Sequence, residues 1–112
     1  MEAQTSGMHE QLDKLKPYIL VVLSKGENYE NEDTPEIIRT QHLPYVFKQK
    51  QAGVLSIAMP VRDETDIAAI GIYNLTDKEQ LKGWLDKDPA VIQGVFTYEI
   101  LNSIGMHGDA LL

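Results

Sequence analysis

The fold of this chain is decided by residues 54–73, VLSIAMPVRDETDIAAIGIY. Two short apolar runs, residues 54–61 and 67–73, are typical of strands. The polar segment 62–66 between them is turn-like, so the two strands are predicted to form a hairpin. Alternate residues are apolar on both sides of these strands, so both faces of the resulting sheet are predicted to be covered.

Outward from the hairpin, two more apolar runs, residues 18–23 and 94–101, indicate a first and a last strand. A helix is predicted between the hairpin and the last strand. Thr76 is its expected N-cap, because Glu79 follows three residues later and completes a capping box. Asp88 precedes a proline and is expected to open a further short turn or helix.

A helical pattern also joins the first strand to the hairpin. Thr34 followed by Pro35 has the form of a helix start, and Gly53 is a natural stop. Pro44 interrupts the pattern because it has no N–H and clashes with the carbonyl four residues back. We therefore expect a short helix and then a longer one with Pro44 in its first turn, which places His42 at or near a helix N-terminus.

The order β, α, β, β, α, β predicts an α+β fold, the ferredoxin-like βαββαβ plait with a four-stranded antiparallel sheet. Right-handed crossovers put both helices on one face of the sheet. The other face is apolar too, so we expect a homodimer through this open sheet face, or a higher oligomer built from it. The expected organisation is an N-terminal arm at 1–15, a domain at 16–101 and a C-terminal tail at 102–112. The arm either docks on something or is a frayed end.

Composition narrows the function classes. The chain has 112 residues, a net charge of −7 and no cysteine. The acidic charge and the scattered lysines argue against nucleic acid as a partner, and no apolar run is long enough for a membrane span. The absence of cysteine excludes thiolate catalysis and Cys-ligated zinc. A polar N-terminus without a signal peptide favours the cytoplasm.

Three stretches resemble the YciI-like (YCII-related) family. Residues 39–45, RTQHLPY, resemble its R-x-x-H-L-x-Y/R-L stretch, and residues 53–60, GVLSIAMP, resemble its G-R-L-L-x-A-G-P strand. Residues 88–96, DPAVIQGVF, are similar to its D-P-Y/F-V-x-x-G-V-F/Y segment. The resemblance covers about residues 17–101. Met59 departs from it, because the family has glycine there, and a large side chain would reshape a pocket.

This resemblance implies a dimeric α/β-barrel with a His–Asp pair facing a cleft. By motif position the pair is His42 and Asp88. Proteins related by fold include lactone isomerases and elimination enzymes that act on small ring compounds. The resemblance thus implies a small-molecule ligand and a cofactor-independent isomerase or lyase type of activity.

The residue types suit acid–base chemistry. Near a helix N-terminus the positive form of His42 is disfavoured, so its neutral ring can accept a proton. Asp88 would orient the ring, and Arg39 would pair with a carboxylate or enolate. With Tyr45 and Met59, Arg39 completes the candidate substrate-binding residues. The set predicts proton abstraction next to a carbonyl, followed by isomerisation or elimination.

Other interpretations stay open. His42 is also explained as a core histidine, Asp88 as a helix cap and Arg39 as a surface residue. The chain is then a non-catalytic ligand-binding or accessory homodimer, or a purely structural module. No metal site is expected, because His9, His42 and His107 follow no ligand spacing. The enzyme hypothesis requires a His42 ring nitrogen within about 3.2 Å of an Asp88 oxygen, with both residues lining a cavity.

Overall fold

The computed structural model describes residues 2–112, with side chains from residue 7 onward. Its centre is one open antiparallel sheet with the strand order β2-β3-β1-β4. The strands are β1 (Leu15–Lys25), β2 (Leu55–Pro60), β3 (Ile67–Tyr73) and β4 (Phe96–Met106). This topology confirms the predicted ferredoxin-like α+β plait with its four-stranded antiparallel sheet.

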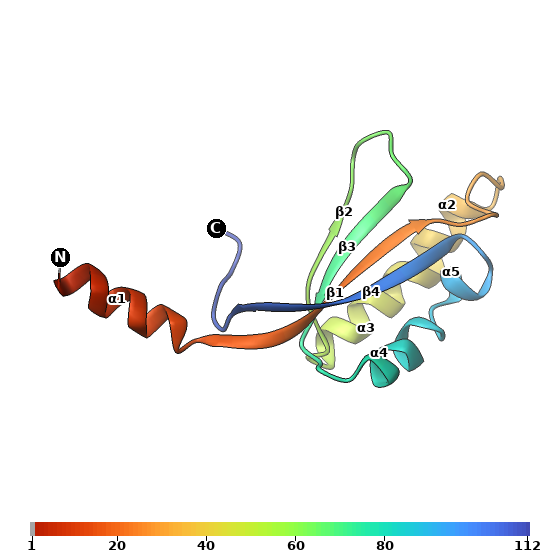
Figure 1. The fold of residues 1–112 in the computed structure, drawn as a ribbon. Helices are drawn as coiled ribbons and strands as arrows, with labels where there is room; N and C mark the ends of the chain where they lie inside the picture. Colours follow the sequence, from red (N-terminus) through yellow and green to blue (C-terminus); the bar gives the residue numbers. More distant parts are fainter. Residues whose placement is uncertain (1) are drawn as a thin grey trace.

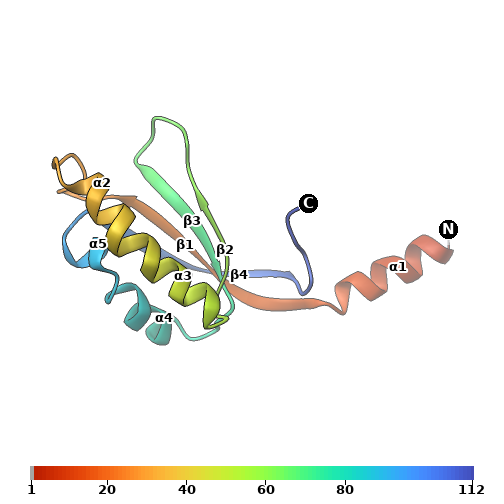
Figure 2. The same ribbon diagram turned by 180° about the vertical axis from the view of Figure 1, so that it is seen from behind.

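Helical segments make up the second layer. They are α1 (Glu2–Leu12), α2 (Thr34–Ile37), η1 (Ile38–His42), α3 (Leu43–Gln51), α4 (Lys78–Leu85) and α5 (Pro89–Ile92). All of them except α1 lie on one face of the sheet (Figures 1 and 2). The two helical connections join β1 to β2 and β3 to β4, which are parallel strands with one other strand between them in the sheet, and right-handed crossovers put both on the same face.

The helix between β1 and β2 runs without a break through α2, η1 and α3, although Pro44 lies inside it. Its middle segment, η1, is a π-helical turn in which the Leu43 N–H donates to the Ile38 carbonyl, five residues back. The wider turn relieves the clash between the proline ring and the Thr40 carbonyl. The prediction of two separate helices is therefore wrong, and His42 is not at a free helix N-terminus.

The start of this long helix differs from the sequence-based prediction, and its end agrees with it. Thr34 is not the N-cap: it is buried, and its hydroxyl donates to the Asn28 carbonyl over 3.0 Å. Asp33 precedes the helix without a capping bond from its side chain. Gly53 ends the helix as predicted, with a φ of 73°, the left-handed conformation that glycine adopts without strain.

The main core lies between the sheet and the helices. It combines Ile19 and Val21 of β1 with Leu81 and Leu85 of α4, and each of these side chains is at most 2% exposed. Val54, Leu55 and Tyr73 complete the buried cluster. Burial of a leucine or isoleucine side chain is worth about 1.5–3 kcal/mol, so this layer holds α4 onto the sheet.

The outer strands are longer than predicted. β1 and β4 pair along their whole length, from Leu15 opposite Met106 to Lys25 opposite Phe96. Residues 102–106, expected in a tail, are therefore strand, because the backbone of β1 supplies their hydrogen-bond partners. Beyond this two-stranded extension, α1 stands away from the sheet (Figure 1) and stretches the molecule to 59 Å.

The sheet face opposite the helices is apolar. Strand register places Leu20 beside Ile72 and Leu101, and Val22 beside Ile70. Met59 pairs with Ile70 and belongs to the same face, with 51% of its surface exposed. The open face is formed by Leu20, Val22, Ile57, Met59, Ile70, Ile72 and Leu101. An apolar patch of this kind is typical of an interaction surface.

The N-cap of α4 is one residue later than the capping box predicted. Asp77, not Thr76, accepts hydrogen bonds at the helix start, from Glu79 N at 2.9 Å and Gln80 N at 3.4 Å. Both Asp and Thr are good caps, and the register of the turn decided between them.

We expect Asp77→Ala to lower the free energy of unfolding by about 1 kcal/mol, the usual loss for an N-cap. Thr76→Ala is the matched control, because Thr76 is exposed and makes no capping bond. Urea denaturation of both variants measures the effect. A larger loss for Thr76→Ala than for Asp77→Ala would contradict the cap seen in the structure.

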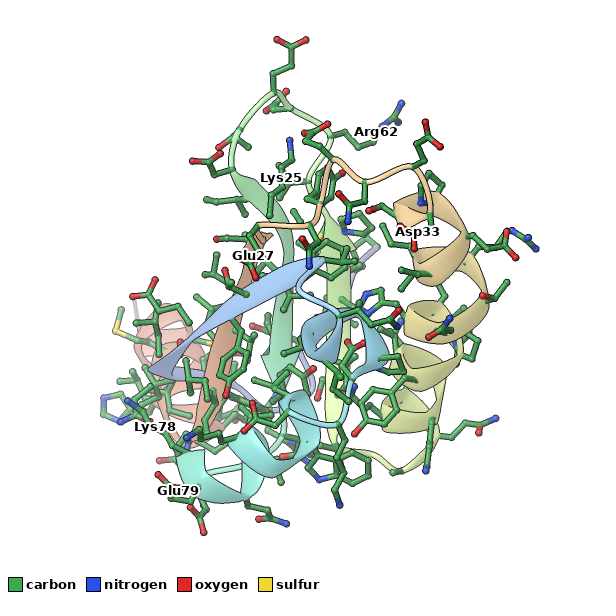
Figure 3. All side chains as sticks on the ribbon, turned by 90° about the vertical axis from the view of Figure 1, so that its right-hand side faces the viewer. Lys25, Glu27, Asp33, Arg62, Lys78 and Glu79 are labelled. Atoms are coloured by element: carbon green, nitrogen blue, oxygen red, sulfur yellow. The ribbon has the colours of Figure 1, made fainter. Side chains whose placement is uncertain are left out.

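Charged side chains lie mainly at the periphery. Figure 3 shows Arg62 on the loop between β2 and β3, and Lys78 and Glu79 at the start of α4. Glu27 and Asp33 flank the acidic connection between β1 and α2. None of the helices within residues 2–112 has the length and apolar character needed to cross a membrane.

Candidate functional site

His42 and Asp88, 46 residues apart, meet beneath the helices. The His42 Nδ1 lies 2.7 Å from Asp88 Oδ2, and the two side chains are only 9% and 4% exposed. His42 comes from the π-helical turn η1, and Asp88 is the N-cap of α5. The distance is within the limit that the enzyme hypothesis sets.

Asp88 divides its two oxygens between two tasks. Oδ1 accepts a hydrogen bond from Ala90 N over 2.9 Å and caps α5, as predicted. Oδ2 is left for His42. A carboxylate is an acceptor only, so the proton between them belongs to Nδ1; in the neutral ring, the second nitrogen, Nε2, then carries the lone pair.

The Nε2 of His42 faces accessible space. It has no hydrogen-bond partner among residues 7–112. In the same range, every side-chain nitrogen or oxygen that is shut off from solvent does have a partner. Nε2 must therefore reach open volume. The Phe96 ring packs at a steep angle against the imidazole, with the ring centroids 5.0 Å apart, and limits how the imidazole can turn.

A cavity of about 220 Å³ lies between α3 and the sheet, and both His42 and Asp88 line it. Most of its other walls are apolar and include Val21, Leu23, Val46, Leu55 and Leu85, while Lys50 also lines it. Two exposed apolar residues of the long helix, Leu43 and Phe47, also border it. An apolar cavity with few polar groups is typical of a small-molecule site.

Gln49 and Tyr73 also line the cavity, and neither residue was among the sequence-based candidates. The Tyr73 hydroxyl donates to Gln49 Oε1 over 2.6 Å. Burial raises the pKa of Tyr73 well above its usual range, and the charge of Asp88 and the neighbouring Tyr45 raise it further. Tyr73 therefore stays a neutral donor in the physiological pH range.

Two candidate substrate-binding residues lie outside the cavity. Arg39 is 70% exposed and pairs with Glu36 over 2.6 Å on the surface of the helix. The Tyr45 hydroxyl donates to the Trp84 carbonyl over 2.7 Å, which joins α3 to α4. Burial, and then the charge of Asp88, raises the pKa of Tyr45. The structure gives both residues a partner within the protein.

Met59 borders the cavity, but its side chain belongs to the opposite face of the sheet. It pairs with Ile70, which pairs in turn with Val22 on the open face. Directly paired residues point to the same side of a sheet. Met59, which stands where the similar YciI-like stretch has glycine, thus adds to the open face.

A second depression, of about 550 Å³, lies on the open face under the C-terminal residues 107–111. Lys16, Tyr18 and Asn74 line it, and Lys16 Nζ donates to Asn74 Oδ1 over 2.9 Å. His107 and Asp109 also line it, but no ion pair joins them among residues 7–112. Within the described residues, no three His, Asp or Glu side chains gather in a way that would hold a metal ion.

The arrangement around His42 suits a general base. Asp88 holds one nitrogen, Phe96 restricts the ring, and the free nitrogen opens on an apolar space. The helix continues through His42, so the dipole of a helix N-terminus does not act on its ring as predicted. Instead, the hydrogen bond to Asp88 sets the tautomer of the His42 ring.

Comparison with known proteins gives the fold and leaves the family open. No family profile and no curated protein sequence matches the chain. The structure is similar to 5-chloro-2-hydroxyhydroquinone dehydrochlorinase from Burkholderia phenoliruptrix AC1100, in complex with 2,5-dihydroxybenzoquinone, with a TM-score of 0.56 and 15% identity over 81% of this chain and 95% of that chain. A dimeric ferredoxin-like protein from an uncultured marine organism has a TM-score of 0.42 and 16% identity over 85% of this chain and 98% of that one. At 15% identity, the first likeness shows that this chain shares the fold of the dehydrochlorinase.

Proposed function

We propose that this protein is a cofactor-independent acid–base enzyme of the isomerase or lyase type, which acts on a small carbonyl or ring compound. His42 is the base and Asp88 orients it. One observation carries the proposal: His42 Nδ1 is held by a buried carboxylate, while Nε2 has no partner among residues 7–112 and the residue lines a largely apolar cavity. A base held in this way can take a proton from a carbon next to a carbonyl.

The size of the cavity limits the substrate. A cavity of about 150 Å³ lined by apolar residues accommodates benzene. The cavity beside His42, at about 220 Å³, therefore suits one ring with a few substituents. Its apolar walls favour the ring, and its few polar atoms select where the oxygen atoms of the ligand lie.

The two resemblances support the same class of compound. The motifs around His42 and Asp88 resemble those of the YciI-like family, to which we propose that the chain belongs. The dehydrochlorinase of similar fold was solved with a quinone, a six-membered ring that carries oxygen atoms. Small cyclic ketones are thus suitable first probes.

Proton exchange on cyclohexanone tests the proposal directly. In D₂O, the protein should accelerate the replacement of the hydrogens next to the carbonyl by deuterium, measured by NMR. The reference is an equal concentration of free imidazole, and an excess over this reference supports a base positioned in the cavity. Binding of cyclohexanone without excess exchange would instead favour a non-catalytic ligand-binding protein.

We further propose that the protein is a homodimer through the open face. The seven apolar residues of this face lie on all four strands. A second copy of the sheet covers them by isologous packing, which a two-fold axis produces. A stable interface buries about 800 Å² on each partner, which is within reach of a four-stranded sheet.

Leu20→Lys should convert this dimer to monomers, because it places a charge at the centre of the open face. Ile92→Lys is the matched control: Ile92 is 68% exposed on α5, on the helical side. Sedimentation velocity at micromolar concentration measures both variants. A wild-type protein that sediments as a monomer would contradict the dimer.

A further inference from the structure

Gln49 is a buried polar residue in the wall of the cavity. It is only 1% exposed and belongs to α3, seven residues after His42. Seven residues make about two helical turns and rise roughly 10 Å, so the two side chains lie on the same side of the helix. Both face the sheet, and both line the cavity.

Tyr73 fixes the orientation of the Gln49 amide. The Tyr73 hydroxyl has a single proton, which it donates to Gln49 Oε1 over 2.6 Å. The amide NH₂ group must then point away from the tyrosine. Because burial and nearby charge keep the tyrosine protonated, this orientation is stable over the physiological pH range.

Within the described residues, the NH₂ group of Gln49 has no acceptor. No hydrogen bond from Nε2 is found among residues 7–112. Every polar side-chain atom in that range that is shut off from solvent has a partner. Nε2 therefore reaches accessible space, and the cavity is the space that Gln49 lines. A ligand oxygen in the cavity would accept from this NH₂ group in place of water.

We propose that Gln49, oriented by Tyr73, determines the specificity of the site by donating hydrogen bonds to an acceptor oxygen of the ligand. The ligand class is a single-ring compound with a carbonyl, phenolate or carboxylate oxygen, and amines are excluded. This inference rests on the proposed function, since it assigns the oxygen-binding part of the same cavity. A donor at this point also stabilises negative charge that develops on the oxygen when His42 removes a proton.

The opposite orientation of the amide makes the opposite prediction. If Gln49 presented its oxygen to the cavity, the site would select ligands that donate, such as amines. The Tyr73 hydroxyl proton would then lose the acceptor that Gln49 Oε1 provides. Ligand preference thus distinguishes the two orientations.

Three probes of similar shape test the preference: cyclohexanone, cyclohexylamine and methylcyclohexane. Their dissociation constants for the wild-type protein are measured by NMR titration. We expect cyclohexanone to bind more tightly than either of the others. Preferential binding of cyclohexylamine, or equal binding of cyclohexanone and methylcyclohexane, would overturn the inference.

The double variant Gln49→Met with Tyr73→Phe removes both polar partners and keeps their approximate shape. Replacing both partners in this way is nearly neutral for folding. Cyclohexanone binding should weaken roughly 3–10-fold, the value of one hydrogen bond, while methylcyclohexane binding stays the same. Gln93→Met is the matched control, because Gln93 is exposed and bonds to Gln41 away from the cavity.

A measurement on the wild-type protein keeps the test decisive if the double variant does not fold. Addition of cyclohexanone should shift the side-chain NH₂ resonances of Gln49 downfield, and an unchanged resonance at saturation would refute the contact. The result is also independent of turnover. A preference for cyclohexanone without proton exchange would contradict only the proposed function. Proton exchange without that preference would contradict only the role of Gln49.

Discussion

We expect His42→Asn to lower the rate of proton exchange on cyclohexanone by about 10²–10⁴-fold, the usual contribution of a positioned base. The asparagine amide nitrogen takes approximately the place of Nδ1 and can still donate to Asp88 Oδ2. The variant thus keeps the buried hydrogen bond and loses only Nε2, the atom that faces the cavity. The free energy of unfolding should fall by about 1–2 kcal/mol, because the ring contact with Phe96 is lost.

His107→Asn is the matched control for this variant. His107 is exposed and lies near the C-terminus, under which the separate depression on the open face is found. Its replacement should change neither exchange nor stability. If His42→Asn retained the wild-type exchange rate, His42 would be a buried structural residue, and catalysis by this pair would have to be abandoned.

The sequence was sufficient for the topology but not for the strand ends. The alternation in residues 54–73 marks a hairpin, because the two strands are adjacent in the chain and a short polar turn joins them. The extension of β4 to Met106 depends on pairing with Leu15, which is 91 positions earlier, and residues 102–106 have no local pattern that reveals it. Local periodicity reports on neighbours, whereas strand length depends on distant partners.

The helix between β1 and β2 shows a second limit. Pro44 predicts a break, because an α-helix cannot accept a proline at that position. The chain keeps the helix by widening one turn at η1. A widened turn depends on packing around it and has no sequence signal of its own, although such turns are frequent at functional sites.

Two residues of the candidate site were predicted from sequence motifs, and two more were found only in the structure. His42 and Asp88 were selected from their motifs, and the structure places them in contact. Gln49 was missed because a glutamine in a helix is usually exposed, and Tyr73 because it ends an apolar strand. A signal was present: Gln49 falls two turns after His42 and therefore on the same side of the helix. Nothing in the sequence showed that this side is buried.

Asp88→Asn should separate the two tasks of Asp88. Asn caps a helix about as well as Asp, so Ala90 N keeps its acceptor and the free energy of unfolding should change by less than about 1 kcal/mol. The amide nitrogen then faces His42 as a donor. The Nδ1 atom has to accept, and the ring proton moves to Nε2. A protonated Nε2 cannot act as a base, so exchange should fall by about 10²–10⁴-fold.

The ¹⁵N spectrum of the His42 ring reports this change apart from activity. In the wild-type protein the proton should be on Nδ1, and in Asp88→Asn it should be on Nε2. Asp86→Asn is the matched control, because Asp86 is exposed and accepts from the Tyr98 hydroxyl over 2.7 Å, with no contact to His42. A ring that keeps its proton on Nδ1 in Asp88→Asn, with exchange unchanged, would show that Asp88 is a helix cap only. If the proton moves to Nε2 and exchange is lost, the Asp88 carboxylate holds His42 in the tautomer that acts as a base, since the fold and the cap are the same in both proteins.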